Sequence, residues 1–349
     1  MTKISRSFSG IIIGLIFSTV SILFLFFSEQ NYVNSFKLVD FAQKNTIDLT
    51  SYTPSPTNNN KLVKISGVVK SNQNLSDGIV NIPNSIKLKR TAEIYQWNEI
   101  HSANNQIYKY KKEWNSELKN SDNFEKLEYK NPKEYKYKPL EIYAKNVKLG
   151  HFYVSEDIVK DINSAIKLQQ LPYNNKFKTY NGFYFTGKDF DTPSIGDEKL
   201  FYSYVPSGIK VSIIAKQSGN QLVPMNTKYG DITIITNSSS DLKQILNEYK
   251  AFKLNNIWGI RGICLLLIFI GLNLILQPIM NTTGRIPILG EINQFAITFA
   301  TVIITLTLGT IVIALNWIFV RPEFAIPAIF FAVLILLPLR KKKKIIISE

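Results

Sequence analysis

One long uncharged stretch near the N-terminus constrains this chain more than any other feature. Residues 10–28 contain no charged side chain, and at about 1.5 Å per residue a helix of this length crosses a hydrocarbon core of about 30 Å. Lys3 and Arg6 before it are also typical of a signal peptide. The stretch is longer than a usual signal core, and bulky Phe26 and Phe27 stand where a cleavage site needs small residues. We therefore expect an uncleaved membrane helix.

Three further membrane helices are expected near the C-terminus. They cover residues 257–277, 293–317 and 324–339. Arg261 lies near one end of the first, where a long side chain can reach the membrane surface. The last stretch is short and contains Pro327 and Pro338, so we expect it to be kinked or tilted. The predicted fold class is a multipass α-helical membrane protein with four spans.

Positive residues beside the short loops predict the orientation of these helices. With the N-terminus in the cytoplasm, a C-terminal basic cluster stays inside, formed by Arg340, Lys341, Lys342, Lys343 and Lys344. Such adjacent cations also attract anionic lipid, by about 1 kcal/mol each. We therefore expect cytoplasmic segments at 1–9, 278–292 and 340–349. Residues 29–256 and 318–323 are expected on the extracytoplasmic side, since long segments are translocated largely regardless of charge.

The polar segment 29–256 shows the period of two that is typical of half-buried strands. Ile86, Leu88, Ala92 and Ile94 fall on one face, with polar residues between them. Further strands are predicted at 199–205, 210–217 and 231–236, with glycine-containing turns between them. The segment is therefore predicted to be a large β-rich (α+β) domain between spans 1 and 2.

Two helices are expected at the borders of this domain. Apolar positions at helical spacing predict a short helix within residues 36–49, followed by a Pro- and Asn-rich linker at 51–61. Asp241 is a suitable N-cap for a helix over residues 242–254, which leads into the second span.

The residues that most chemistry requires are scarce in this sequence. Cys264 is the only cysteine, and His101 and His151 are the only histidines, so neither an internal disulfide nor a typical zinc site is expected. The carboxylates between Asp189 and Glu198 lack the spacing of a calcium loop and have no recognisable nucleophile beside them. We expect no cofactor, no metal and no catalytic residue. The lysine- and tyrosine-rich stretch 129–143 is interpreted as a solvated face without nucleic acid.

Several groups of residues leave two interpretations open. Trp97 and Trp114, with neighbouring tyrosines, form either an aromatic binding face or ordinary cross-strand packing. In the third span, Thr298, Thr301 and Thr305 share one helix face, and Thr305 forms a small-xxx-small pair with Gly309. This face serves either packing within a four-helix bundle or self-association. Polar Asn273 in the second span is expected to face a partner helix.

A series of residues along the chain resembles the transmembrane protein 43 family, also called LUMA. The residues that carry the resemblance are Trp97, Trp114, Asn131, Pro132, Gln217, Pro224, Gly230, Asp231, Trp258, Arg261 and Asn273. The resemblance implies a non-enzymatic integral membrane protein that self-associates and organises or scaffolds membrane protein complexes. In eukaryotic members it implies the endoplasmic reticulum and the nuclear inner membrane, with envelope or lamina-associated partners; a bacterial member would lie in the inner membrane.

Two other functions remain as alternatives at this point. The extracytoplasmic domain could bind a lipid or another ligand in an apolar pocket lined by Phe183, Phe185, Tyr202 or Tyr204. A membrane-bound enzyme would have to use the carboxylates between Asp189 and Glu198. The expected partners are the lipid bilayer, a second copy of the chain and other membrane proteins.

Overall fold

The computed structural model describes the backbone of residues 3–102, 107–237, 241–283 and 289–340. Side chains are described for residues 9–101, 108–237, 241–278 and 294–335. The chain divides into two units, each of which is described by itself. The helical unit comprises Met1–Lys44, Thr227–Gly230 and Lys243–Glu349, and the β unit comprises Asn45–Asn226 and Asp231–Leu242.

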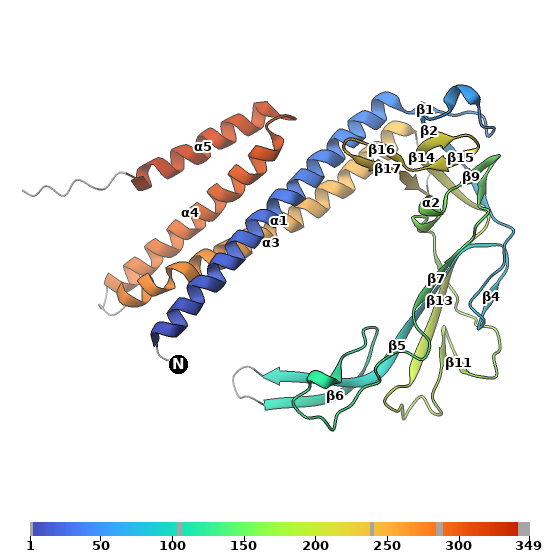
Figure 1. Cartoon of the computed structure of the whole chain (residues 1–349), viewed down its shortest axis with the longest axis horizontal. Coiled ribbons are helices and arrows are strands. Elements are labelled where there is room, and N and C mark those ends of the chain that lie inside the picture. The colour runs from blue at the N-terminus through green and yellow to red at the C-terminus, as the bar shows by residue number, and fades with distance from the viewer. Residues whose placement is uncertain (1–2, 103–106, 238–240, 284–288, 341–349) are drawn as a thin grey trace, which may run out of the picture. The chain divides into compact units, whose positions relative to one another are not determined.

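The helical unit contains long apolar helices, coloured blue, orange and red in Figure 1. They are α1 (Lys3–Asn45), α3 (Leu242–Thr283), α4 (Leu289–Trp317) and α5 (Pro322–Arg340). Among the described residues, three stretches are long and apolar enough to cross a membrane: Ser9–Asn45, Leu242–Pro278 and Gln294–Trp317. They contain the first three predicted spans except Asn293. In α5 the described apolar part, Pro322–Ile335, is shorter, so the fourth span stays a prediction.

Both helices expected at the domain borders are found, although neither is separate. The helix predicted within 36–49 is the end of α1, which continues without a break to Asn45. The helix predicted at 242–254 begins at Leu242 as expected and runs on into the second apolar stretch. The C-terminal end of α1 and the N-terminal end of α3 are therefore polar, and each is continuous with an apolar stretch of the same helix.

Small residues bring α1 and α3 into backbone contact. A Cβ on Gly14 would lie 2.5 Å from the carbonyl oxygen of Gly271, and a Cβ on Gly271 would lie 2.4 Å from Ser18 Oγ. Any larger side chain at either glycine would push the helices apart. Because Gly14 meets Gly271 while Gly10 lies beside Leu274, α1 and α3 run antiparallel. Figure 1 shows them side by side.

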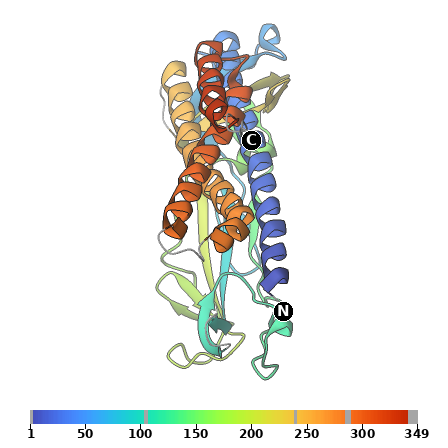
Figure 2. The ribbon, with the colours of Figure 1, turned by 90° about the vertical axis from the view of Figure 1, so that its left-hand side faces the viewer.

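The helix α4 packs on α3 through the face that sequence analysis singled out. A Cβ on Gly309 would lie 2.4 Å from Leu265 Cδ2 of α3, and Thr301 and Thr305 on the same face are buried. Beyond α4 the chain turns back as α5, which forms a helical hairpin with α4 (Figures 1 and 2). These contacts favour packing within the bundle over self-association for this face. Asn273 donates to the Phe269 carbonyl of its own helix at 2.9 Å.

The β unit contains a small closed barrel. Five strands pair in a ring, β2–β8–β9–β15–β14 and back to β2, while β1 and β18 extend it at β2 and β14. The strands are β1 (Ile47–Asp48), β2 (Leu62–Lys70), β8 (Lys148–Leu149), β9 (Phe152–Val154), β14 (Ile209–Ser218), β15 (Gln221–Val223) and β18 (Ile234–Thr236). Closure leaves the ring strands without a free edge, which limits pairing with other chains.

A second sheet is built around one long strand, β5, which pairs with β13, β6 and β7. Its strands are β5 (Ser85–Ser102), β6 (Ile107–Asn115), β7 (Leu140–Tyr143), β10 (Ile166–Lys167), β11 (Lys178–Tyr180), β12 (Phe183–Phe185) and β13 (Glu198–Pro206). Two ribbons, β3 (Leu75–Ser76) with β4 (Asn81–Ile82) and β16 (Met225–Thr227) with β17 (Gly230–Ile232), complete the sheets. The remaining short helices are α2 (Glu156–Lys160), η1 (Pro56–Asn58) and η2 (Ser121–Asn123).

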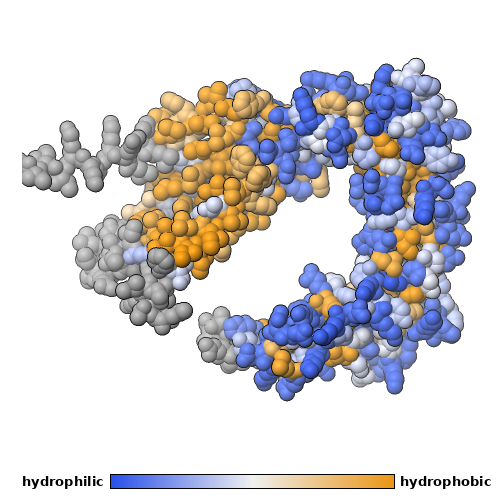
Figure 3. All heavy atoms as spheres, viewed as in Figure 1, coloured by the Kyte–Doolittle hydropathy of each residue, from blue (hydrophilic) through white to orange (hydrophobic). Residues whose placement is uncertain are grey.

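The predicted period of two in β5 is confirmed by burial. Ile86, Leu88, Ala92 and Ile94 are each at most 1% exposed and, apart from Ile94, belong to one core cluster shared by the barrel and the second sheet. The strands predicted at 199–205 and 210–217 are also found, and the segment predicted as one strand at 231–236 is divided between β17 and β18, which belong to different sheets. In Figure 3 hydrophobic residues dominate the described surface of the helices, and hydrophilic residues dominate that of the β unit. The structure therefore has the predicted β-rich domain and long apolar helices.

Candidate functional site

A buried ion pair joins three helices of the helical unit. Glu29 of α1 is 0% exposed, and Arg261 of α3 meets it with two hydrogen bonds, Nε to Oε1 at 2.5 Å and Nη2 to Oε2 at 2.9 Å. Trp317 of α4 donates its Nε1–H to the same carboxylate at 3.2 Å. The Arg261 guanidinium also lies 4.7 Å from the ring centroid of Trp258. Bidentate charge-assisted hydrogen bonds of this kind fix geometry as well as charge.

This arrangement corrects the role expected for Arg261. The sequence predicts that its side chain reaches the membrane surface, whereas the structure turns it onto Glu29, with 8% of the residue exposed. The signal for the pair was present in the sequence. Glu29 ends the first apolar stretch and Arg261 begins the second, so antiparallel helices place the two opposite charges at the same level. A buried charge costs several kcal/mol unless it is paired in this way.

A groove of about 770 Å³ lies in the helical unit beside this pair. The order of the lining residues along the helices shows which part of the groove lies beside the ion pair. Aromatic side chains of Tyr32, Trp258 and Trp317 line it at the level of the ion pair, together with Arg321. Further along α4 and α5 its walls are small or aliphatic: Thr310, Ile313, Ala314, Ala325 and Ala328. Tryptophan and tyrosine are the side chains that favour membrane–water interfaces.

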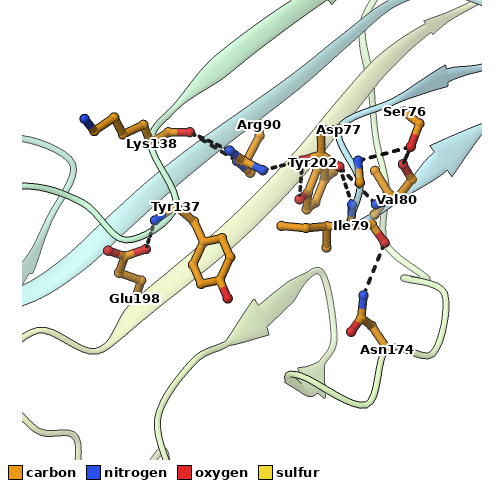
Figure 4. Close-up of polar contacts among 11 residues, drawn as sticks. Ser76, Asp77, Ile79, Val80, Arg90, Tyr137, Lys138, Asn174, Glu198 and Tyr202 are labelled. Atoms are coloured by element: carbon orange, nitrogen blue, oxygen red, sulfur yellow. Dashed lines mark hydrogen bonds and ion pairs between the residues drawn. The ribbon is translucent and has the colours of Figure 1, made fainter.

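The β unit contains a second buried charge cluster, drawn in Figure 4. Asp77, in the turn between β3 and β4, has a fully buried side chain and pairs with the guanidinium of Arg90 on β5. It also accepts from the Tyr202 hydroxyl of β13 at 2.8 Å. Arg90 donates onward to the Lys138 carbonyl at 2.9 and 3.2 Å. Burial raises the pKa of Tyr202 well above its usual range, which keeps this hydroxyl a donor.

The sequence carried a signal for this cluster as well. Arg90 occupies the same face of β5 as Leu88 and Ala92, which the period of two predicts to be buried. A cation in a buried register requires a partner, and Asp77 supplies it from a turn that was predicted only as a turn. We infer that the pair holds the β3–β4 ribbon on the long sheet.

Two of the carboxylates considered for catalysis or calcium, Asp189 and Glu198, make structural contacts. Glu198 is 1% exposed and accepts backbone N–H bonds from Lys136 and Tyr137 at 2.6 and 3.0 Å. Burial raises the pKa of Glu198, and the two backbone donors oppose that rise. Asp189 accepts from Thr192 and from the Asp191 backbone, which is a local turn. In the part of the chain that the structure describes, no group of three or more His, Cys, Asp and Glu could hold a metal.

Two of the motif residues act together at the far end of β5. Asn131 accepts the backbone N–H of Trp97 at 2.7 Å and donates to the Trp97 carbonyl at 3.0 Å. The side-chain amide of Asn131 thus makes the two backbone hydrogen bonds that a neighbouring strand would otherwise make with Trp97. The Trp97 ring packs edge-on against Tyr129, with centroids 4.7 Å apart, and Lys112 lies over it at 4.9 Å. This is packing between strand and loop.

Trp114 and Pro132 also pack within the second sheet. The Trp114 ring lies 5.2 Å from Tyr95, its cross-strand neighbour, and the Lys199 ammonium lies 4.2 Å from its centroid. A Cβ on Gly196 would meet Pro132 Cγ at 3.2 Å, and Gly196 has a φ of +95°, so glycine suits this close contact. Trp114 therefore fits the cross-strand interpretation, whereas the aromatic contact of Trp97 is with a loop and only its contact with Lys112 is cross-strand.

Gln217 anchors the linker to the barrel. Its side chain is 1% exposed on β14 and donates to the carbonyls of Ser55 and Gly219 at 2.8 and 3.0 Å. Its backbone pairs with Asn60 and Lys61. The predicted linker 51–61 is therefore tied down by one buried amide, a role that its composition did not indicate.

The remaining motif residues lie near the β16–β17 ribbon and in α3. Pro224 precedes β16, Gly230 begins β17 with a φ of +117°, and Asp231 is exposed and accepts from Asn226 at 2.8 Å. Trp258 is 62% exposed. In the C-terminal basic cluster, Lys341 to Lys344 and the side chain of Arg340 lie outside the described residues.

The apolar ligand pocket considered for the β unit is filled by its own side chains. Phe185 is 0% and Tyr202 is 3% exposed, and both belong to the packed interior. Phe183 stacks on Tyr180 with centroids 5.3 Å apart. A cavity of about 480 Å³ that includes Tyr202 is lined mostly by polar residues. The packing counts against the ligand-binding alternative at this place.

A surface ion pair of the second sheet yields a pH-dependent prediction. The Lys89 ammonium, at 2.7 Å, and the Tyr143 hydroxyl lower the pKa of Glu141 to about 2. This is below the value of about 4.3 in an unfolded chain, so the contact stabilises the fold above pH 4.5 and is lost as the pH falls towards 2. We expect Glu141→Gln to cost at most about 1 kcal/mol at pH 7, because water screens the pair.

Urea unfolding of the full-length protein in detergent, followed at pH 7 and at pH 3, measures this effect. The difference between Glu141→Gln and the wild type should shrink at the lower pH. A difference that is independent of pH would show that the carboxylate charge is not what stabilises this contact.

Comparison with known proteins yields a family match over most of the chain. A family model described as transmembrane protein 43 matches residues 89–322. Transmembrane protein 43 of Rattus norvegicus and of Homo sapiens are each 24% identical over 355 residues, covering 93% of this chain and 88% of the relative. The transmembrane protein 43 homolog of Drosophila melanogaster is 23% identical, covering 85% of each chain. No solved structure matches.

Proposed function

The chain belongs to the transmembrane protein 43 family, and from this we propose that it is a non-enzymatic membrane protein that self-associates and organises membrane protein complexes. Its proposed partners are a second copy and other membrane proteins. The buried carboxylates at Glu29, Asp77 and Glu198 all take part in structural contacts. This use of the charged groups favours a scaffold over an enzyme.

We propose four spans with both chain ends in the cytoplasm. The antiparallel contact of α1 with α3 supports an arrangement in which the chain leaves the membrane at the end of α1 and re-enters it through α3 from the same side. Trp317, at the end of α4, reaches the Glu29 carboxylate, which supports placing the α4–α5 turn on that same side. The span through α5 then returns the chain to the cytoplasm, where the C-terminal basic cluster is expected.

One exposed stripe on α4 carries the proposal of self-association. Phe295, Phe299, Val302 and Leu306 are 75%, 58%, 38% and 53% exposed, and they recur at spacings of four, three and four. This is the spacing of the seam in left-handed helix pairs, which prevail in membranes. The neighbouring face of α4, which carries Thr305 and Gly309, is already occupied by α3. A second copy would therefore associate through this outer stripe.

Replacing Phe295, Phe299 and Leu306 together by alanine tests this proposal. We expect the apparent dissociation constant of the self-associated protein to rise about tenfold or more, since packing area is lost from a helix interface. Energy transfer between differently labelled full-length copies, diluted in lipid vesicles, measures it. The matched control replaces Ile16, Leu23 and Phe24, which are similarly exposed on α1. Strictly monomeric wild-type protein, or an equal loss in the control, would contradict the proposal.

A further inference from the structure

Two cations meet at one aromatic ring near the groove of the helical unit. The Arg321 guanidinium lies 5.2 Å from the ring centroid of Phe36, and the Lys250 ammonium lies 5.1 Å from the same centroid. Of the ion pairs formed by described residues, none includes either cation. Both cations lie beside the same ring without an ion-pair partner among the described residues, so an anion near Phe36 would be attracted by both charges.

Among the described residues of the helical unit, no ion pair balances the charge of Arg321 on the groove. Arg261 also lines the groove, but Glu29 neutralises it. Lys253 and Lys250 line a smaller adjoining cavity of about 200 Å³, which shares Phe36 with the groove. The nearest acidic residue along the chain from Arg321 is Glu323, which forms no ion pair with any described residue. The rim of the groove therefore has a net positive charge.

The groove changes from cationic to apolar along the helix axes. Arg321 and the aromatic residues line it at the level of the ion pair, and Ala314, Ala325 and Ala328 line it further into the apolar part of α4 and α5. An anionic phospholipid has a matching arrangement, with a charged headgroup followed by apolar acyl chains. A soluble anion would use only the rim, and an uncharged apolar ligand would leave the cations unpaired.

We propose that this groove binds an anionic phospholipid of the surrounding bilayer. Its phosphate would lie at Arg321, which lines the groove, and would be attracted as well by Lys250, which lines the adjoining cavity beside Phe36. An acyl chain would run along the alanine-lined wall of α4 and α5. The site goes beyond the proposed scaffold function, and its α4 residues, from Thr310 to Trp317, lie further along the helix than the outer stripe of residues 295–306. The volume of about 770 Å³ is in the range of ligand pockets, about 300–1,000 Å³.

Native mass spectrometry of the full-length protein in mild detergent tests the proposal. The probes are dioleoyl phosphatidylglycerol, dioleoyl phosphatidylcholine and the soluble headgroup analogue glycerol phosphate. The wild type should bind phosphatidylglycerol most tightly. Near a membrane surface each cation contributes about fivefold in affinity for anionic lipid, so Arg321→Gln with Lys250→Gln should weaken its binding about 25-fold. Lys243→Gln, an exposed lysine earlier on α3, is the matched control and should have no effect.

A second variant distinguishes a lipid from other occupants. Ala328→Phe fills the wall of the groove and leaves the cations in place, so it should reduce the binding of both lipids. If glycerol phosphate fully competes with phosphatidylglycerol, the groove is an anion site and not a lipid site. If Ala328→Phe lowers self-association and leaves lipid binding unchanged, a second copy occupies the groove. Either result overturns the proposal, as does unchanged phosphatidylglycerol affinity in the charge variants. Lys250→Gln and Ala328→Phe test it separately if the double variant fails to fold.

Discussion

Replacing Glu29 by leucine is expected to lower the stability of the helical unit by about 3 kcal/mol or more, because Arg261 would then carry an unpaired charge in a buried site. The variant also removes the acceptor of the Trp317 indole N–H. Three helices meet at this carboxylate, so the loss should loosen α1, α3 and α4 together. We expect a lower thermal midpoint in detergent and a shift in tryptophan emission, since Trp258 and Trp317 both lie at the pair.

The double variant Glu29→Leu with Arg261→Leu separates charge from shape. Replacing a whole buried ion pair by apolar residues is often neutral or stabilising, so the double variant should recover much of the stability that the single one loses. Gln30→Leu, at an exposed neighbouring position of α1, is the matched control. A single Glu29→Leu variant that is as stable as Gln30→Leu would show that the ion pair does not hold the helices together.

The second large effect is expected in the β unit, at Asp77. Alanine at this position should cost about 3 kcal/mol or more, because Arg90 would remain charged and nearly buried while Tyr202 loses its acceptor. The backbone N–H groups of Ile79 and Val80 also lose their acceptor, Asp77 Oδ1, at 2.9 and 3.0 Å. The β3–β4 ribbon should therefore detach from the long sheet before the barrel unfolds.

Pulse proteolysis of the full-length protein in increasing urea measures this change. Asp77→Asn should fall between the wild type and Asp77→Ala, because the amide keeps an acceptor oxygen and loses the charge. Asp231→Ala is the control, since Asp231 is exposed with one hydrogen-bond partner, and it should change stability by less than about 0.5 kcal/mol. Equal urea midpoints for Asp77→Ala and Asp231→Ala would refute the assigned role of the cluster.

The strands could be predicted from the sequence because their pattern is local. Ile86 and Leu88 lie two residues apart on a half-buried strand, and their burial follows from that spacing alone. The closure of the barrel could not be predicted in this way. Closure depends on the pairing of β2 with β14, which places Ile65 opposite Ile213. The sequence of neither segment indicates that the two strands pair.

The candidate site illustrates the same division. Arg261 was singled out from the sequence, through the family resemblance that the comparisons confirm. Its partner Glu29 was not, since the two residues lie far apart in the chain. Asp77 and Arg90 were both missed, although a cation in a buried register was a usable signal. The role of Gln217 in holding the linker also appears only when Ser55 is brought beside it.

The sequence by itself determined the apolar helices, the β-rich segment between the first two of them and the family of the protein. These properties depend on length, periodicity and motif residues, which are read along one stretch of chain at a time. Only the tertiary structure decided which of the described charges are paired and which are not. Glu29 pairs with Arg261, and Arg321 and Lys250 both lie against Phe36, because helix packing, and not sequence distance, determines which groups meet.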